Sequence, residues 1–330
     1  MTSEAADKHT EIERLVAALR SGDARALGRA ISLVENDTPA ARHLLSACFP
    51  HIGKALRVGV TGAPGAGKST LVDAIAKQLR AKDHTVGIVA VDPTSPFSGG
   101  AILGDRIRMQ SHHADPGLFI RSMATRGFLG GMARTTADVA LVVEASGKDT
   151  ILLETVGVGQ DEVDVMRVAD VTVVVLVPGM GDDVQSIKAG LMEIADIFVI
   201  NKSDRDGADR VEREIRAMQS LASSHSEWVA PAVKTIATTG EGISSLLKTI
   251  DRFSAWLNES GDLQRRRALA WQKRMSDMAR EELIRRLAMH GLDAEVFAQH
   301  AATVSRGDED PYELIPRLLQ NAWAGGGQEK

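Results

Sequence analysis

The chain has 330 residues, of which 44% are hydrophobic and 25% charged, a composition that is typical of a soluble globular protein and excludes a disordered or fibrous one. Its net charge of −5 gives no basic surface of the kind that binds nucleic acid. The apolar run at residues 171–177 is too short to span a bilayer, and the polar N-terminus lacks an apolar signal region, so we expect no membrane association. The single cysteine, Cys48, predicts core packing in a reducing compartment, and we expect a cytoplasmic protein.

Apolar residues recur at helical spacing from Glu11 onward, which predicts an N-terminal helical extension over residues 1–55 whose first ten residues are disordered. Thr38 and Pro39 indicate a helix start, because threonine can cap a helix and proline suits its first position. We expect this extension to pack against the core domain rather than to bind a partner.

Residues 56–258 alternate short β-branched runs with amphipathic helices, which predicts an α/β fold with a mostly parallel, doubly wound sheet of the P-loop NTPase kind. The predicted strands cover residues 57–60, 85–91, 118–121, 150–154, 171–177, 197–200 and 232–236. Ligands of such sheets bind at the carboxyl ends of the strands. The residues that follow each strand are therefore the candidates for the functional site.

The first strand runs into a stretch that fits the phosphate-binding pattern G-x-x-x-x-G-K-[ST]. Its residues are Gly62, Ala63, Pro64, Gly65, Ala66, Gly67, Lys68, Ser69 and Thr70. The glycines allow successive N–H groups to face a polyphosphate at the start of the next helix. Lys68 can reach the β and γ phosphates, and the Ser69 hydroxyl is suited to the Mg²⁺ that bridges them. The pattern predicts a nucleotide site.

Carboxylates follow two further strands. Asp92 ends the second strand and Asp105 lies beyond a Pro-, Ser- and Gly-rich loop; both suit a Mg²⁺ shell, with turn formation or helix capping as the alternative. Glu154 has the position of a Walker B carboxylate, and the N–H of the nearby Gly157 can sense a γ-phosphate. Val158 stands where a Ras-type enzyme has its water-orienting glutamine, which predicts slow intrinsic hydrolysis.

Residues 201–204 form the pattern N-K-x-D, which reads a guanine base. The Asp204 carboxylate can accept hydrogen bonds from the N1–H and N2 amino groups of guanine, a pair of donors that adenine does not present. Lys202 can lie along the base, and Asn201 can tie this loop to the phosphate loop. A backbone N–H near Ala237, at the end of the last predicted strand, could meet the guanine O6. The residues expected to complete the base site there are Thr235, Ile236 and Ala237.

Two further stretches suggest movement and assembly. Residues 179–188 combine glycines and paired acids, which indicates either a mobile loop or an ordinary strand-to-helix connection. The charged helical segment at residues 263–290, with Trp271, Met275 and Met278 at helical spacing, predicts a C-terminal arm over residues 259–330 that favours dimerisation and ends in a disordered tail. The three arginines at 265–267 are expected to form a solvated face.

Taken together, these motifs resemble the MeaB/ArgK family of P-loop GTPases, chaperones associated with methylmalonyl-CoA mutase. The resemblance covers about residues 40–290 and rests on five stretches: 62–70, 91–95, 104–106, 154–160 and 201–204. It implies bound GTP or GDP, and a homodimer. It implies that four residues surround Mg²⁺: Ser69, Asp92, Asp105 and Glu154.

The same resemblance implies residues for catalysis and coupling. We expect Lys68, Glu154 and Lys188 to act in hydrolysis. The resemblance implies that the loop at 179–188 is an additional switch that communicates with the adenosylcobalamin-dependent mutase. The expected function is that of a chaperone that protects the mutase and gates its cofactor loading.

Two alternative functions remain. A metallochaperone GTPase of the hydrogenase or urease type shares the core but is expected to carry Cys-rich or His-rich ligands, whereas this chain has one cysteine and no histidine tract. The adjacent pair His112-His113 is not expected to bind a metal, because neighbouring side chains of a helix would point in different directions. An ATP-dependent small-molecule kinase needs an acceptor pocket and has no use for residues 201–204.

Overall fold

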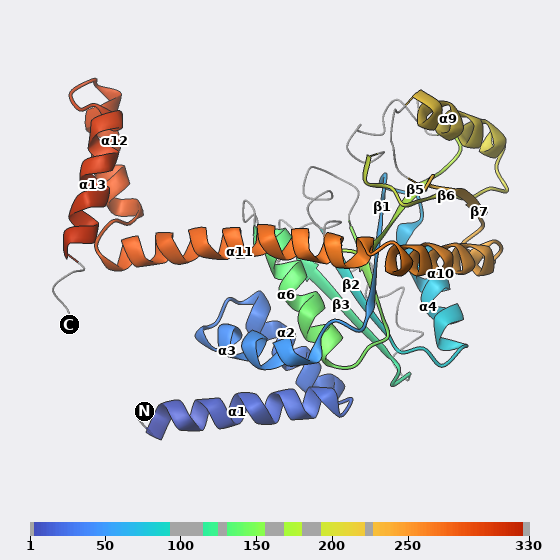
Figure 1. Ribbon diagram of the computed structural model, residues 1–330, viewed down its shortest axis with the longest axis horizontal. Coiled ribbons are helices and arrows are strands. Elements are labelled where there is room, and N and C mark those ends of the chain that lie inside the picture. Colours follow the sequence, from blue (N-terminus) through green and yellow to red (C-terminus); the bar gives the residue numbers. More distant parts are fainter. Residues whose placement is uncertain are drawn as a thin grey trace. The chain divides into compact units, whose positions relative to one another are not determined.

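The computed structural model describes residues 3–92, 115–124, 131–155, 168–179, 193–221 and 227–325. Its described strands form one parallel sheet in the order β3-β2-β4-β1-β5-β6-β7 (Figure 1). They are β1 (Leu56–Gly62), β2 (Val86–Asp92), β3 (Leu118–Ala124), β4 (Thr150–Glu154), β5 (Val171–Leu176), β6 (Ile197–Asn201) and β7 (Ala232–Thr235). Each overlaps a predicted strand, so the predicted α/β fold is confirmed.

Helices cover both faces of the sheet (Figure 1). On one face, α4 (Lys68–Arg80) and α10 (Ile243–Glu259) pack over side chains such as Val60 and Val173. On the other face, α6 (Gly131–Ala145) packs over Ile151 and Leu153, and α9 (Ala208–Leu221) packs over Phe198. Successive residues of a strand point to opposite faces, so strands covered on both sides must be apolar throughout. This is why the β-branched runs mark the strands so well.

The N-terminal extension packs on the α6 face, as expected. Its helices are α1 (Ser3–Arg20), α2 (Ala24–Glu35), α3 (Pro39–Cys48) and the 3₁₀ turn η1 (Phe49–His51). The prediction that the first ten residues are disordered is wrong for residues 3–10, which lie in α1. The side chains of His9 and Glu13, one helical turn apart in sequence, contact each other across 3.3 Å. Thr38 does not cap α3, because its hydroxyl donates backward to the Leu33 carbonyl at 3.1 Å.

Two compact units make up the chain, Met1–Arg267 and Ala268–Lys330, and the boundary between them falls within α11 (Asp262–Met289). The second unit also contains α12 (Ala294–Ser305) and α13 (Pro311–Gly325), which the sequence did not predict. Asp293 caps α12, since its carboxylate accepts hydrogen bonds from the N–H groups of Glu295 and Val296. None of the described helices is long and apolar enough to cross a membrane.

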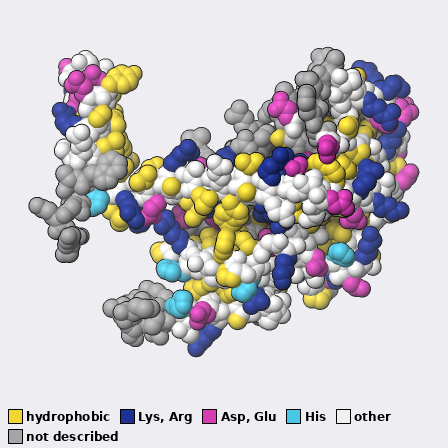
Figure 2. Space-filling model, in the orientation of Figure 1, with side chains coloured by type: hydrophobic (Ala, Val, Ile, Leu, Met, Phe, Trp, Pro, Cys, Tyr) yellow, Lys and Arg dark blue, Asp and Glu magenta, His cyan; other side chains and the backbone are white. Residues whose placement is uncertain are grey.

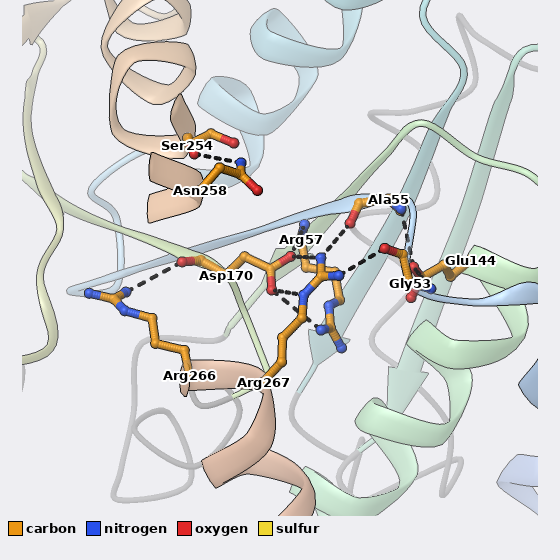
Figure 3. Close-up of polar contacts among 9 residues, drawn as sticks. All are labelled: Gly53, Ala55, Arg57, Glu144, Asp170, Ser254, Asn258, Arg266 and Arg267. Atoms are coloured by element: carbon orange, nitrogen blue, oxygen red, sulfur yellow. Dashed lines mark hydrogen bonds and ion pairs between the residues drawn. The ribbon is translucent and has the colours of Figure 1, made fainter. Parts of the chain in front are cut away.

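The amino ends of three strands are joined by an ion-pair network that we call the arginine anchor: Arg57, Asp170, Asp196, Arg266 and Arg267. Asp170, directly before β5, accepts two hydrogen bonds from the Arg267 side chain, at 2.8 and 2.7 Å (Figure 3). It accepts two more from Arg57, one from the backbone N–H at 3.0 Å and one from the side chain at 3.3 Å. Asp196, directly before β6, accepts two from Arg266, both at 2.9 Å. The prediction of a solvated face is therefore wrong for Arg266 and Arg267, because a run of arginines in sequence does not reveal the buried carboxylates that it meets in the fold.

The anchor also fixes the turn that leads into β1. Arg267 donates to the carbonyls of Gly53 and Ala55, both at 2.9 Å. From the other side, the Glu144 carboxylate of α6 accepts the N–H groups of the same two residues, at 2.6 and 3.1 Å (Figure 3). Buried main-chain groups are costly unless they are paired, so these contacts set where β1 begins.

The two carboxylates of the anchor have pKa values that move in opposite directions. Burial by itself raises the pKa of Asp170, but the hydrogen bonds from Arg267 and the charges of Arg57 and Arg267 outweigh burial and hold this pKa below its ordinary value of 3.8. Burial prevails at Asp196 and raises its pKa, although Arg266 binds it. The difference follows from the number of cations, two beside Asp170 and one beside Asp196.

We predict that Asp170→Asn lowers the free energy of unfolding at pH 7 by about 3 to 5 kcal/mol, the usual cost of removing one partner from a buried ion pair. Because the pKa of Asp170 is lowered in the folded state, its stabilisation is complete above pH 3.8 and is lost as the pH falls further, so the gap between variant and wild type must close in acid.

Urea unfolding followed by tryptophan fluorescence at several pH values measures this. The matched control is Asp277→Asn, which breaks the exposed pair with Arg280 on α11 and should cost less than about 1 kcal/mol. Equal losses in the two variants would show that the anchor contributes no more than a surface pair.

Candidate nucleotide site

The phosphate loop, residues 62–70, connects β1 to α4 at the carboxyl edge of the sheet. Gly62 and Gly67 have φ angles of +143° and +86°, which side chains rarely allow. The neighbouring atoms also leave no space for a side chain at either glycine. A Cβ on Gly62 would lie 2.2 Å from the Val175 carbonyl oxygen, and one on Gly67 would lie 2.6 Å from Nδ2 of Asn201. Neighbouring segments therefore approach the loop as closely as a bare backbone permits.

The loop ends at the amino end of α4, where Gly67 precedes the first helical residue, Lys68. The first N–H groups of a helix have no partners within it, and with the helix dipole they favour an anion. A tight glycine cradle that ends at such a helix start fits a polyphosphate.

Lys68 and Ser69 place a cation and a hydroxyl at the same point. The Lys68 side chain is only 6% exposed, and its Nζ donates to the carbonyls of Gly62 and Ala63 at 2.9 and 3.1 Å. The Ser69 hydroxyl donates to Oε1 of Glu154 at 2.5 Å. Hydroxyl and carboxylate oxygens are hard ligands of the kind that Mg²⁺ prefers, so this pair fits the ion expected beside the phosphates.

Asn201, at the end of β6, joins the phosphate loop to the base-reading loop. Its Nδ2 donates to the Ala66 carbonyl at 2.8 Å. Its Oδ1 accepts the Thr235 hydroxyl at 3.2 Å and the Ala237 N–H at 3.1 Å. The side chain is 2% exposed, so water does not compete for these bonds. The tie between the two loops that the sequence suggested is present.

Lys202 adds a second tie. Its backbone has φ = +54°, an unusual value for a residue with a side chain, and its Nζ donates to the Gly65 carbonyl at 2.8 Å. Asp204 is exposed, so its carboxylate is accessible to a ligand.

The stretch 235–237 differs in detail from expectation. The Ala237 N–H, to which the sequence assigned the guanine O6, donates to Asn201, and the Thr235 hydroxyl does the same. The Ile236 N–H donates to the Glu241 carbonyl at 3.0 Å. Thr235 and Ala237 thus support Asn201, an arrangement that the sequence did not indicate because the motif states residue types and not their partners.

The remaining predicted residues are only partly described. Asp92 ends β2 two residues beyond Ala90, which pairs with Glu154 in the parallel ladder, so its backbone lies at the same edge of the sheet. Its side chain lies outside the described part of the structure, and so do three whole residues: Asp105, Gly157 and Lys188.

Sequence reasoning did not single out Thr61 as part of the site. It precedes Gly62, and its hydroxyl accepts a hydrogen bond from that of Thr155 at 3.0 Å, both side chains being buried. The only signal in the sequence is a hydroxyl in an otherwise apolar strand that leads into the phosphate loop.

A glycine cradle at a helix start, tied by an asparagine to an N-K-x-D loop on a parallel sheet, defines the class of a P-loop nucleotide-binding protein. Comparison with known proteins narrows the class. A family model described as "Methylmalonyl Co-A mutase-associated GTPase MeaB" matches residues 27–291. The chain belongs to this family of GTPases.

Relatives cover nearly the whole chain. A putative GTPase of Pyrococcus abyssi is 47% identical over 96% of this chain and 98% of its own. The mouse protein named methylmalonic aciduria type A homolog, mitochondrial, is 35% identical over 94% of this chain and 79% of its own. Among solved structures, one titled as an LAO/AO transport system kinase covers 97% of this chain and 98% of its own at 28% identity, with a TM-score of 0.70.

We predict that Asp204→Asn lowers affinity for GTP at least about tenfold, because each hydrogen bond to a charged group contributes roughly 1.5 to 3 kcal/mol. The variant should bind xanthosine triphosphate better than GTP, since the new amide can donate to the oxygen that replaces the guanine amino group. Calorimetry with both nucleotides tests this. The control is Asp206→Asn, the same change at another exposed position of the loop. A variant at 204 that still prefers GTP would remove the base-reading role.

Proposed function

We propose that the chain is a Mg²⁺-dependent GTPase switch that protects methylmalonyl-CoA mutase and gates the loading of its adenosylcobalamin. The observation that carries this proposal is the match of residues 27–291 to a family named for its association with that mutase. The site geometry supports the switch: Asn201 links the base-reading loop to the phosphate loop, so both ends of one nucleotide can act on the same structure.

We assign roles to the site residues on the basis of their placement. The phosphate-loop N–H groups and Lys68 would hold the β and γ phosphates, and Ser69 and Glu154 would hold Mg²⁺ directly or through water, together with Asp92 and Asp105. Mg²⁺ would supply charge neutralisation between the phosphates.

The chain's own residues leave the catalytic step incomplete. Val158 cannot orient a water, so basal hydrolysis should be slow unless Gln160, Lys188 or a partner supplies the missing polar contact. Slow turnover suits a switch that waits for its client, because the GTP-bound conformation then persists until the client changes the loops near the γ-phosphate. Gly157 and the loop at 179–188 are the segments to which we assign this response.

The first test measures GTP turnover with and without adenosylcobalamin-dependent methylmalonyl-CoA mutase. We predict that the mutase stimulates turnover at least about tenfold, since a partner that completes the site of a slow GTPase can raise its rate by orders of magnitude. A loop variant that removes Asp182, Gln185 and Lys188 together by change to alanine should lose most of this stimulation.

A matched triple variant, in which the exposed Lys248, Asp251 and Gln264 of α10 and α11 become alanine, should retain the stimulation. Binding must be coupled in both directions: if the mutase changes affinity for GTP, then GTP must change affinity for the mutase by the same factor, which calorimetry checks. Failure of the mutase to stimulate the wild type would count against this client.

We also propose that the chain forms a homodimer through α11. Met275 and Met278 are 59% and 48% exposed, and the large apolar side chains of the same helix that are also exposed are Leu269, Leu283, Ile284 and Met289. Figure 2 shows hydrophobic side chains among the charged ones along this helix. Exposed apolar side chains on one helix favour a second copy, because a two-fold interface is self-complementary.

We predict that Met275→Glu combined with Met278→Glu converts the dimer to a monomer, since each charge would be buried without a partner. Light scattering gives the mass. These substitutions are better than a truncation from residue 263, which would also remove Arg266 and Arg267 of the arginine anchor. The control adds the same charges at the exposed polar positions Gln272 and Ser276. A persistent dimer would place the interface elsewhere.

A further inference from the structure

Two hydroxyl groups face each other in the core beneath the nucleotide site. Thr61 of β1 is fully buried and Thr155, directly after β4, is 3% exposed. The Thr155 hydroxyl donates to that of Thr61 at 3.0 Å. Most side chains around them on these strands are aliphatic, and valine has nearly the same shape as threonine. Packing alone would therefore accept valine at both positions, and the hydroxyls call for another explanation.

The pair lies next to the phosphate loop on one strand and next to Glu154, a residue that we assign to the Mg²⁺ site, on the other. Thr61 precedes Gly62, where the phosphate loop begins, and Thr155 follows Glu154, whose carboxylate accepts the Ser69 hydroxyl. Val60 pairs with Glu154 at the end of the parallel ladder, and the two threonines are the residues that directly follow this pair. The hydroxyl pair thus connects the strand that carries the phosphate loop to the strand that carries Glu154.

The two threonines do not face the nucleotide. Val60 belongs to the core beneath α4, and Leu153 belongs to the core on the opposite face of the sheet. Because side chains alternate along a strand, Thr61 and Thr155 point to the face away from α4, whereas Glu154 points toward Ser69. Any effect of the pair on the site must therefore pass through the backbone.

The hydroxyl pair reinforces a weak point in the ladder. β4 ends at Glu154, and beyond it the Thr155 N–H donates to the Val60 carbonyl at 3.2 Å. A single main-chain hydrogen bond at the end of a strand still allows the backbone to rotate there. A second hydrogen bond, from the side chain of the same residue, restricts that rotation. In a buried site water does not compete for this bond, so it remains directional.

We propose that Thr155 is a positioning residue of the GTPase, whose hydrogen bond to Thr61 holds the Glu154 carboxylate at the distance from Ser69 that Mg²⁺ needs. This inference rests on the assignment of Ser69 and Glu154 to the Mg²⁺ site and is independent of the mutase. Loss of the Thr155 hydroxyl should weaken Mg²⁺ binding at Glu154. It should leave nucleotide binding by the phosphate loop unchanged.

The test compares Thr155→Val with wild type in two measurements. The first is the Mg²⁺ concentration that gives half-maximal GTP turnover, which should rise about threefold to tenfold, the range that one net hydrogen bond supports. The second is affinity for a fluorescent GDP analogue with and without Mg²⁺. The gain in affinity that Mg²⁺ provides should shrink, and affinity in the presence of a chelator should stay unchanged.

Three further variants separate positioning from packing. Thr155→Ser keeps the hydroxyl and should restore the Mg²⁺ dependence of the wild type. Thr61→Val removes the hydroxyl that accepts the hydrogen bond from Thr155 and should raise the Mg²⁺ requirement at least as much as Thr155→Val does. Thr249→Val makes the same chemical change at a buried threonine of α10, whose hydroxyl bonds to the Ser245 carbonyl at 2.9 Å, and should leave Mg²⁺ dependence unchanged.

Glu154→Gln serves as the reference for the metal assignment. If it does not raise the Mg²⁺ requirement, the assignment of Glu154 fails, and this inference fails with it. If Glu154→Gln raises the requirement but Thr155→Val behaves like Thr249→Val, the metal assignment stands and the positioning role is overturned. A serine variant as impaired as the valine variant, or a Thr61→Val variant with the Mg²⁺ dependence of the wild type, would also overturn it.

Discussion

One amide group holds the nucleotide site together. Asn201 donates to Ala66 in the phosphate loop and accepts from Thr235 at the end of β7 and from Ala237 just beyond it, so three stretches that are distant in sequence meet at its side chain. An amide suits this position because it carries a donor and an acceptor in one plane, whereas an aspartate would have no donor for Ala66. The absence of a side chain at Gly67 is part of the same arrangement, since Asn201 fills that space. The spacing between the phosphate and base ends of the site depends on this group.

The strands that carry the site are also fixed at their other ends. β1, β5 and β6 begin at the arginine anchor. At their carboxyl ends, β1 reaches Gly62, β5 lies beside Gly62 through Val175, and β6 ends at Asn201. Buried ion pairs add little net stability over apolar contacts, because desolvation offsets most of the attraction. The bidentate contacts instead fix orientation, because the guanidinium groups of Arg266 and Arg267 each bind both oxygens of one carboxylate in a single geometry. The anchor therefore sets the register of these strands more than it strengthens the fold.

The sequence predicted the parts of this structure that depend on local composition. Buried parallel strands are continuous apolar runs, and the phosphate loop requires glycines with positive φ angles, so both features can be recognised in the sequence alone. The helix at residues 3–10 was missed because polar residues hid its helical continuation. Arg266, Arg267 and the Ala237 N–H were misjudged for a different reason: each has its partner more than thirty residues away, and a motif does not state partners.

Alternation along the strands explains how chemistry and support are divided at this site. Glu154 and Val60 share a rung and point toward α4, so the residue after each of them must point into the opposite core. A side chain there cannot touch a nucleotide, yet its backbone is continuous with the residues that do. Hydrophobic packing alone restricts the orientation of such a residue only weakly. A hydrogen bond between two hydroxyls, as in Thr61 and Thr155, restricts it more because hydrogen bonds are directional. In a sheet covered on both faces, polar side chains behind a site are thus informative, because burial makes each of them costly unless its hydrogen bond is kept.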